Sequence, residues 1–103
     1  MIATWSVEQL ADGTSRVIVT GEVDLAVEEP FVAEVDSVAA ARDGGSAVVL
    51  DLGGVTFLDS SGVRALIRLR QRHGERLRLG ELSTPVRRVL EIAGLCEFFG
   101  IVR

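Results

Sequence analysis

This chain has very few of the side chains that build metal centres and covalent cross-links. Among its 103 residues there is one cysteine, Cys96, and one histidine, His73. A single cysteine excludes an internal disulfide and a cysteine zinc site. The lone histidine excludes most other metal sites and most histidine-dependent catalysis. We therefore expect neither a metal nor a cofactor.

Long apolar runs are missing as well. No stretch approaches the roughly 18 residues of a membrane span, and the N-terminus lacks the basic and apolar blocks of a secretory signal. Hydrophobic residues make up 48% and charged residues 25%, which is typical of a globular chain, and the length suits one domain. We predict a single soluble cytoplasmic domain over residues 1–103, with no direct membrane contact.

Lysine is absent, and the eleven arginines are unevenly distributed. Residues 1–62 carry eleven acids and two arginines, whereas residues 63–103 carry nine arginines and four acids. The net charge of −4 argues against nucleic-acid binding, which requires cations to neutralise phosphates. The uneven charge indicates either two different faces for a partner or two halves that neutralise each other in the fold.

The first half of the chain predicts a hairpin and a helix. Residues 4–10 form an edge strand, residues 16–20 its returning partner after an Asp-Gly turn, and residues 21–24 leave that strand. Pro30 fits the first turn of a helix, close to Glu28 and Glu29 at its positive end. The helix then presents one apolar face and stops at residues 44–45, two glycines.

The second half alternates strands with helices. Residues 47–50 with Leu52 predict a central strand covered on both faces, followed by a helix over 61–73 that ends at Gly74. This helix turns Val63, Leu66 and Ile67 inward, and its opposite flank carries three arginines: Arg64, Arg68 and Arg72.

A short strand over 77–82, a helix capped by Ser83 or Thr84 and ending at Gly94, and a last strand over 98–102 complete the chain. The order β-β-α-β-α-β-α-β indicates an α/β sandwich: a mixed, mainly parallel sheet of about four to five strands with about three helices. The pattern does not decide whether the helices cover one face of the sheet or both.

The loop between the central strand and the second helix is the candidate site, because such loops hold ligands in folds of this class. It reads Asp59-Ser60-Ser61-Gly62. Gly62 allows another backbone to approach, and a phosphoryl group on Ser60 would lie beside the positive end of the helix. The alternative is an ordinary helix cap. A serine hydrolase is excluded because His73 lies about 18 Å away along the helix; we predict that the protein is not an enzyme.

Residues 49–66 closely resemble the core motif of STAS domains, and among these the bacterial anti-sigma factor antagonists, which regulate transcription. Residues 21–25 resemble a second motif of that family, and the segment from Leu82 to Leu95 resembles its third helix and following turn. The resemblance covers nearly the whole chain. Two departures are the end of the chain at Arg103, where a C-terminal helix often begins in that family, and a shift of Pro30 by about one residue.

The resemblance implies a partner switch. In that family the serine matched by Ser60 is phosphorylated by an ATP-bound serine kinase that is also the anti-sigma factor. The unphosphorylated form binds this kinase and releases the sigma factor, and a phosphatase of the PP2C type resets the phosphorylated form. The oligomeric state stays open between a monomer and a weak dimer. The predicted partner-binding residues are Gly21, Glu22, Asp24, Asp59, Ser60, Ser61, Gly62, Arg64 and Arg68.

Asp24 has two interpretations: it repels a phosphate on Ser60 or orients the loop, or it is a turn acid that caps nearby N–H groups. The whole domain also has an alternative function, as an unphosphorylated STAS-type subunit of a membrane lipid ABC transport complex. The intact Asp-Ser-Ser-Gly motif favours the switch, whereas neighbouring permease and ATPase genes would favour the transporter.

Overall fold

Two antiparallel strands open the fold of the computed structural model, which describes residues 3–41 and 46–101. β1 (Thr4–Gln9) pairs with β2 (Ser15–Val23). In the turn between them Gly13 has a φ of 94°, which only glycine adopts at little cost. The Asp12 carboxylate accepts a hydrogen bond from the Thr14 N–H at 2.9 Å. The predicted hairpin is therefore confirmed.

The two later strands extend this hairpin into a mixed sheet of order β1-β2-β3-β4. β3 (Val48–Leu58) runs parallel to β2, and β4 (Leu77–Leu82) runs parallel to β3. The helical segments are α1 (Leu25–Ala40), α2 (Ser60–His73), the short 3-10 helix η1 (Gly74–Arg76) and α3 (Thr84–Ile92). The α/β class with a mixed, mainly parallel sheet is thus confirmed.

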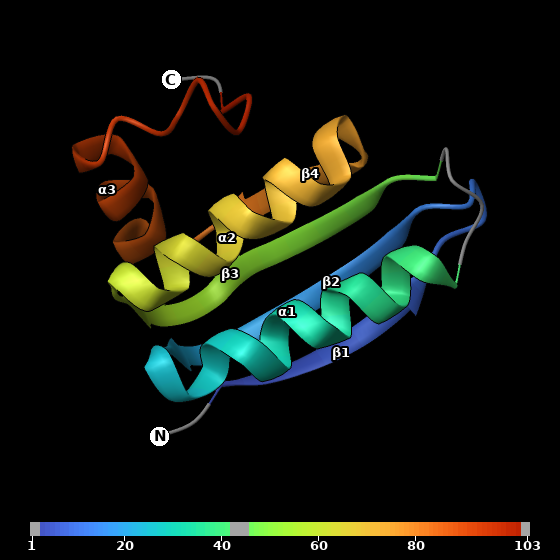
Figure 1. The fold of residues 1–103 in the computed structure, drawn as a ribbon, viewed down its shortest axis with the longest axis horizontal. Coiled ribbons are helices and arrows are strands. Elements are labelled where there is room, and N and C mark those ends of the chain that lie inside the picture. The colour runs from blue at the N-terminus through green and yellow to red at the C-terminus, as the bar shows by residue number, and fades with distance from the viewer. Residues whose placement is uncertain (1–2, 42–45, 102–103) are drawn as a thin grey trace.

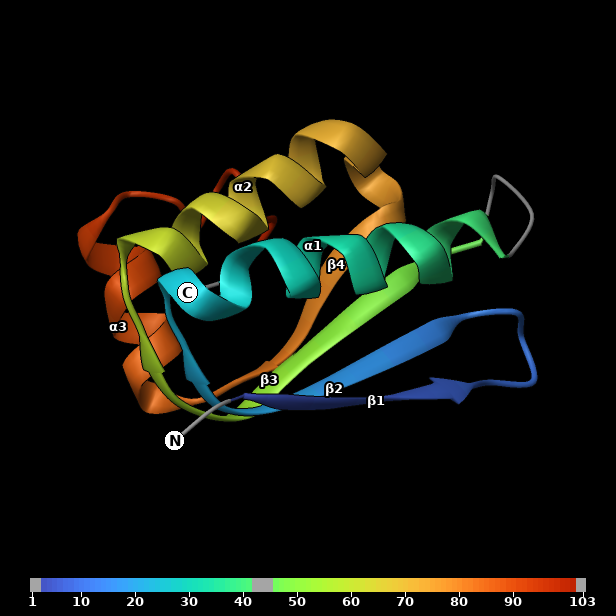
Figure 2. The same ribbon diagram turned by 60° about the horizontal axis from the view of Figure 1, so that its bottom comes forward.

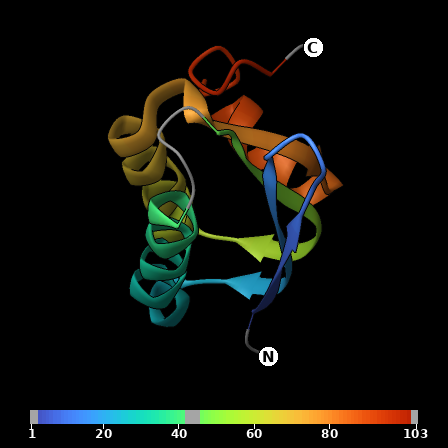
Figure 3. The same ribbon diagram turned by 90° about the vertical axis from the view of Figure 1, so that its right-hand side faces the viewer.

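The helices are unequally placed around this sheet (Figure 1). α1 and α2 lie side by side on the same face of the sheet, as the two turned views show (Figures 2 and 3). α3 lies at the end of the sheet where β3 finishes and α2 begins (Figures 1 and 2). No helix in the described ranges combines the length and apolar character needed to cross a bilayer.

The hydrophobic core fills the space between the sheet and the pair α1 and α2. Alternate residues of β2 point inward, while Leu50 and Leu52 of the central strand are almost completely buried. Trp5 of the edge strand packs its ring against Phe31 of α1, with centroids 5.9 Å apart. The other large buried side chains include Val35, Leu66, Leu69, Leu77 and Leu90.

Helix α1 begins earlier than the sequence predicts. Asp24 is its N-cap and accepts a hydrogen bond from the Ala26 N–H at 3.1 Å. Pro30 consequently lies inside the helix, not in its first turn. Pro30 has no N–H to donate to the Ala26 carbonyl. Both residues are exposed, so water can donate a hydrogen bond to that carbonyl. The predicted end of this helix at residues 44–45 lies outside the described residues.

Two strand predictions also need correction. β2 does not end at residue 20 but continues through Val23, because the backbone pairs onward with β3 past two irregularities in register. The strand expected over 98–102 does not form in its described part, residues 98–101. There the Gly100 N–H donates to the Glu97 carbonyl and the Ile101 N–H to the Cys96 carbonyl, so turns use groups that a strand would pair.

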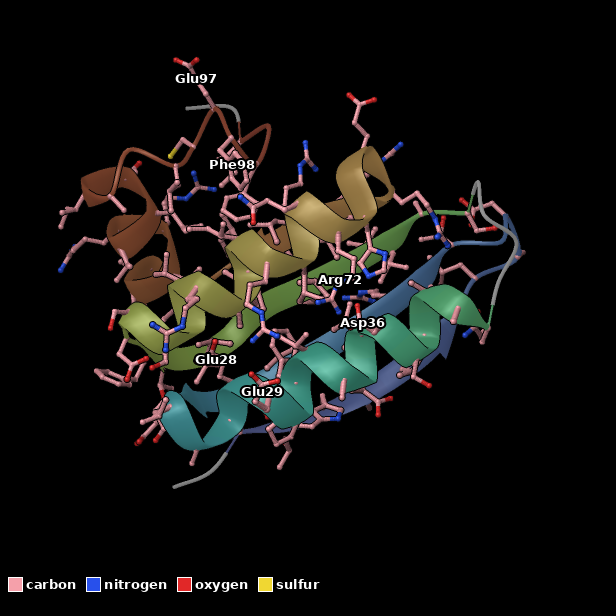
Figure 4. The ribbon with its side chains drawn as sticks, viewed as in Figure 1. Glu28, Glu29, Asp36, Arg72, Glu97 and Phe98 are labelled. Carbon is pink, nitrogen blue, oxygen red and sulfur yellow. The ribbon has the colours of Figure 1, made fainter. Side chains whose placement is uncertain are left out.

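The three arginines of the outer α2 flank do not face open solvent alone; they pair with acids of α1. Of these, Arg72 lies beside Asp36 in Figure 4. Arg64 and Arg68 bind Glu28, and Arg68 also binds Glu29 at 2.8 Å. Further along, Asp36 pairs with Arg72 and with His73. The acidic first half and the basic second half of the chain therefore neutralise each other along this line of contact.

Two of the acids in the fold are held in the charged form. Hydrogen bonds from the Arg64 guanidinium, with a smaller contribution from Arg68, lower the pKa of Glu28 and outweigh its burial. Burial alone would raise the pKa of Asp51, but the Gly53 N–H and Arg16 together lower it. A lowered pKa in the folded state stabilises the fold above the ordinary pKa and ceases to do so as pH falls.

We predict that Glu28→Gln lowers the free energy of unfolding at pH 7 and weakens its dependence on acid. The contribution of the Glu28 carboxylate is complete above its ordinary pKa of 4.5 and disappears as pH falls through the lower folded value. The variant should therefore lose less stability than the wild type over this range. Urea unfolding at a series of pH values measures this.

The matched control is Glu29→Gln, because Glu29 is a neighbouring acid whose side chain is 76% exposed and contacts Arg68 only at the surface. The free energy of unfolding of Glu29→Gln should stay within about 0.5 kcal/mol of the wild-type value at each pH. Equal losses of stability on acidification in wild type and Glu28→Gln would contradict the assignment.

Candidate functional site

Asp59 holds the loop that follows the central strand. It is the N-cap of α2, and its Oδ1 accepts hydrogen bonds from the N–H groups of Ser61 at 2.9 Å and Gly62 at 3.1 Å. These two donors would otherwise be unsatisfied at the start of the helix. The predicted loop is thus a helix cap, and the side chains of residues 60–62 take fixed directions from it.

Gly62 brings the start of α2 against the ends of two strands. A Cβ at this position would lie 2.3 Å from Leu58 Cδ1 and 3.0 Å from the Val23 carbonyl oxygen. The Asp59 N–H donates to the same carbonyl at 3.4 Å. The close backbone approach expected at Gly62 is therefore present, and its partner is the last residue of β2.

Ser60 and Ser61 point to different environments although they are adjacent. Ser60, the first residue of α2, is exposed, and no hydrogen bond joins its hydroxyl to another residue that the structure describes. Ser61 is only 7% exposed, and its Oγ lies 3.4 Å from Arg64 Nη2. Of these two serines, only Ser60 presents a hydroxyl that a second protein can reach.

The residues predicted from the upstream motif lie beside this loop, since β2 and β3 are parallel and end together. Glu22 pairs with Phe57, and Val23 pairs with Leu58. Gly21 is buried with a φ of 97°, whereas Glu22 and Asp24 are partly exposed. The capping interpretation of Asp24 is confirmed by its bond to Ala26, and its contact with a partner stays a prediction.

The predicted partner residues therefore fall into two groups. Gly21, Ser61 and Gly62 are buried, so they support the exposed residues around them and are not themselves available for direct contact. The members with exposed or partly exposed side chains are Glu22, Asp24, Asp59, Ser60, Arg64 and Arg68.

An apolar groove beside Ser60 was missed by the sequence analysis. It has a volume of about 370 Å³ and lies between the start of α2 and α3, lined by Leu58, Asp59, Ser60, Val63, Val89, Ile92 and Ala93. Ile92 is 82% exposed. The available signal was this isoleucine at the last position of α3. The described residues contain no cluster of three or more His, Cys, Asp or Glu side chains able to hold a metal ion.

The chain is similar to several known proteins. The family described as "Mlab, STAS domain" matches residues 6–102. A Bordetella bronchiseptica protein, BtrV, named as an anti-sigma factor antagonist, is 37% identical over 94 residues, which cover 87% of this chain and 78% of BtrV.

Solved structures of similar proteins share the fold. An anti-sigma factor antagonist from Mycobacterium paratuberculosis superposes with a TM-score of 0.83 at 28% identity, covering 97% of this chain and 85% of that one. The Bacillus cell fate determinant SpoIIAA, in its phosphorylated form, gives a TM-score of 0.67 at 21% identity, covering 91% of this chain and 86% of its own.

We predict that Gly62→Ala lowers the free energy of unfolding by about 1–3 kcal/mol, the usual cost of overpacking a tight contact. The added methyl group meets Leu58 and the Val23 carbonyl, and moving away from them pulls α2 from the strand ends. Chemical denaturation measures the effect. Ser60→Ala is the control, since its exposed side chain should cost less than about 0.5 kcal/mol. Equal stability of the two variants would contradict the close approach.

Proposed function

Because this chain belongs to the STAS domain family, and within it to the anti-sigma factor antagonists, we propose that it is a switch controlled by phosphorylation of Ser60. In the unphosphorylated state it binds an ATP-bound anti-sigma factor serine kinase and thereby releases the sigma factor. Phosphorylation by that kinase ends the binding, and a PP2C-type phosphatase restores it. The exposed Ser60 hydroxyl at the first position of α2 is the observation that supports this proposal most directly.

Position and charge both favour Ser60 as the modified residue. A phosphate there gains from the positive end of α2, so the modified protein can remain folded. The same phosphate adds nearly two negative charges next to Asp59, on the side of the molecule where the end of β2 carries Glu22 and α1 begins with its N-cap Asp24. An acidic group of a partner would be repelled at this surface. An apolar group could contact it only by removing water from the phosphate.

The groove supplies the apolar part of the proposed partner surface. Ser60 is itself one of its lining residues, together with the strongly exposed Ile92. An apolar side chain of the kinase that enters the groove must therefore pass close to the Ser60 hydroxyl. Glu22, Asp24, Arg64 and Arg68 form the polar rim in this proposal, which agrees with the usual anatomy of protein interfaces.

We predict that candidate anti-sigma factor kinases from the same genome, incubated with ATP, place one phosphate on Ser60. Mass spectrometric mapping should find it in the wild type and in Ser61→Ala, because Ser61 is buried, and should find none in Ser60→Ala. Modification only at another residue, or none with any cognate kinase, would reject the switch and favour the transporter-subunit role.

We also expect Ser60→Asp to bind the kinase at least about tenfold more weakly than Ser60→Ala, a difference of about 1.4 kcal/mol. The aspartate introduces a charge into the groove, whereas alanine does not. Isothermal titration of both variants with the kinase measures the difference. Equal affinities would show that charge at this position has no effect on the partner.

The groove itself is tested by Ile92→Asp, which we predict weakens kinase binding by about tenfold or more with little loss of stability. Ile92 is almost fully exposed, so its replacement removes contact with a partner and not with the core. Glu91→Ala, an exposed neighbour outside the groove lining, is the control and should bind as the wild type does. Unchanged affinity of Ile92→Asp would remove the groove from the proposed surface.

A further inference from the structure

Arg64 links a buried acid to the start of α2. Its Nε and Nη2 donate to the two carboxylate oxygens of Glu28 at 2.9 and 2.8 Å. The same Nη2 lies 3.4 Å from Ser61 Oγ. The Arg64 side chain is nevertheless 54% exposed. It therefore combines a strong partner on α1 with a position at the protein surface beside the first turn of its own helix.

Glu28 does not depend on Arg64 alone. Arg68 Nη1 donates to Glu28 Oε2 at 3.1 Å, so the Glu28 side chain, which is 7% exposed, keeps a cationic partner if Arg64 moves away. A buried carboxylate left without any partner would be costly. Here the second arginine makes an exchange of partners by Arg64 energetically accessible.

The spacing places Arg64 on the same face of α2 as Ser60. Residues four apart lie on the same face of a helix, and long side chains lean toward the helix N-terminus. The contact of Arg64 with Ser61 Oγ confirms that its guanidinium reaches the first turn. A phosphate on Ser60 would present three acceptor oxygens and nearly two charges there, and an arginine binds such a group through two parallel hydrogen bonds.

We propose that Arg64 is the positioning residue for the phosphorylated state: when Ser60 carries a phosphate, the Arg64 guanidinium exchanges Glu28 for the phosphate, and Arg68 keeps Glu28. This inference rests on the proposed function, since it requires phosphate at Ser60. It adds a second role for Arg64: a partner contact in the unphosphorylated state, and an internal clamp in the phosphorylated state. The clamp fixes the phosphate near the helix start, where it occupies the mouth of the groove.

The charges around Ser60 make the exchange measurable. Asp59 on the same loop, and Glu22 and Asp24 from the end of β2 and the start of α1, all disfavour the dianionic phosphate. The groove residues contributed by α3 are apolar. Arg64, one turn along the same helix, is a cation that opposes these acids, as the exposed Arg88 of α3 also can. Arg64 should therefore influence how readily the phosphate loses its second proton, which an ordinary phosphoserine does near pH 6.

The test uses full-length protein with phosphoserine incorporated genetically at position 60, titrated by ³¹P NMR. In the wild-type background the phosphate should lose its second proton at a pH lower by about half a unit or more than in Arg64→Gln. Arg72→Gln is the matched control: it removes another guanidinium from the same flank of α2, but one that pairs with Asp36 and lies about two turns beyond Arg64. It should leave the phosphate titration unchanged.

A second variant keeps the test decisive if Arg64→Gln folds poorly. Glu28→Gln removes the competing carboxylate and frees Arg64, so the phosphate should titrate at a still lower pH than in the wild-type background. Identical titrations in the wild type, Arg64→Gln and Glu28→Gln, or a shift in Arg72→Gln equal to that in Arg64→Gln, would overturn the proposal. Because no kinase is involved, failure of Ser60 phosphorylation by kinases would remove the proposed function without altering this result.

Discussion

The contact between Gly62 and the Val23 carbonyl fixes the geometry on which the rest of the site depends. It joins the first turn of α2 to the end of β2 without any side chain between them. Ser61 and Gly62 are held inward by this contact and by the Asp59 carboxylate. With its two followers turned toward the protein, Ser60 is left on the outside. The exposure of one hydroxyl is thus a consequence of close packing at its neighbours.

The second constraint is the line of ion pairs between α1 and α2. The sequence shows an acidic half and a basic half, and either two faces or mutual neutralisation would account for them. The structure supports neutralisation along this contact, because Glu28, Glu29 and Asp36 of α1 meet Arg64, Arg68 and Arg72 of α2. Exposed pairs of this kind add little stability. The buried Glu28 is different, because removing its partners would leave a charge without compensation.

Local signals in the sequence predicted most of the fold. They failed where residues far apart in the sequence determine the structure. β4 matches its predicted bounds, and Ser83, Gly74 and Gly94 begin or end helices as expected, since caps and turns act within a few residues. Pro30 was misplaced because Asp24 offered an earlier cap. The short apolar run near the C-terminus has strand-like composition, but turns use its backbone N–H groups, which composition does not reveal.

The same division applies to the site. Asp59 and Gly62 could be placed from the loop sequence alone, because both act through the start of one helix, whereas the role of Ser60 is what the family resemblance implies. The ion pairs of Arg64 and Arg68 could not be predicted, since their partners are 36 and 40 residues away. The groove was equally hidden, because it forms only when α3 packs beside the start of α2.

The location of Ser60 in the lining of that groove explains how one modification could control a whole surface. A partner that fills the groove excludes water from its walls. Burying the Ser60 hydroxyl without a hydrogen-bond partner costs on the order of 1–3 kcal/mol of binding free energy. The cost is smaller if the hydroxyl finds an acceptor on the partner. A phosphate dianion in the same place must either keep its water, which leaves the groove unfilled, or lose it at a far greater cost. In the proposed switch, phosphorylation of Ser60 therefore needs no movement of the backbone, because the charge alone converts the apolar groove into one that must stay hydrated.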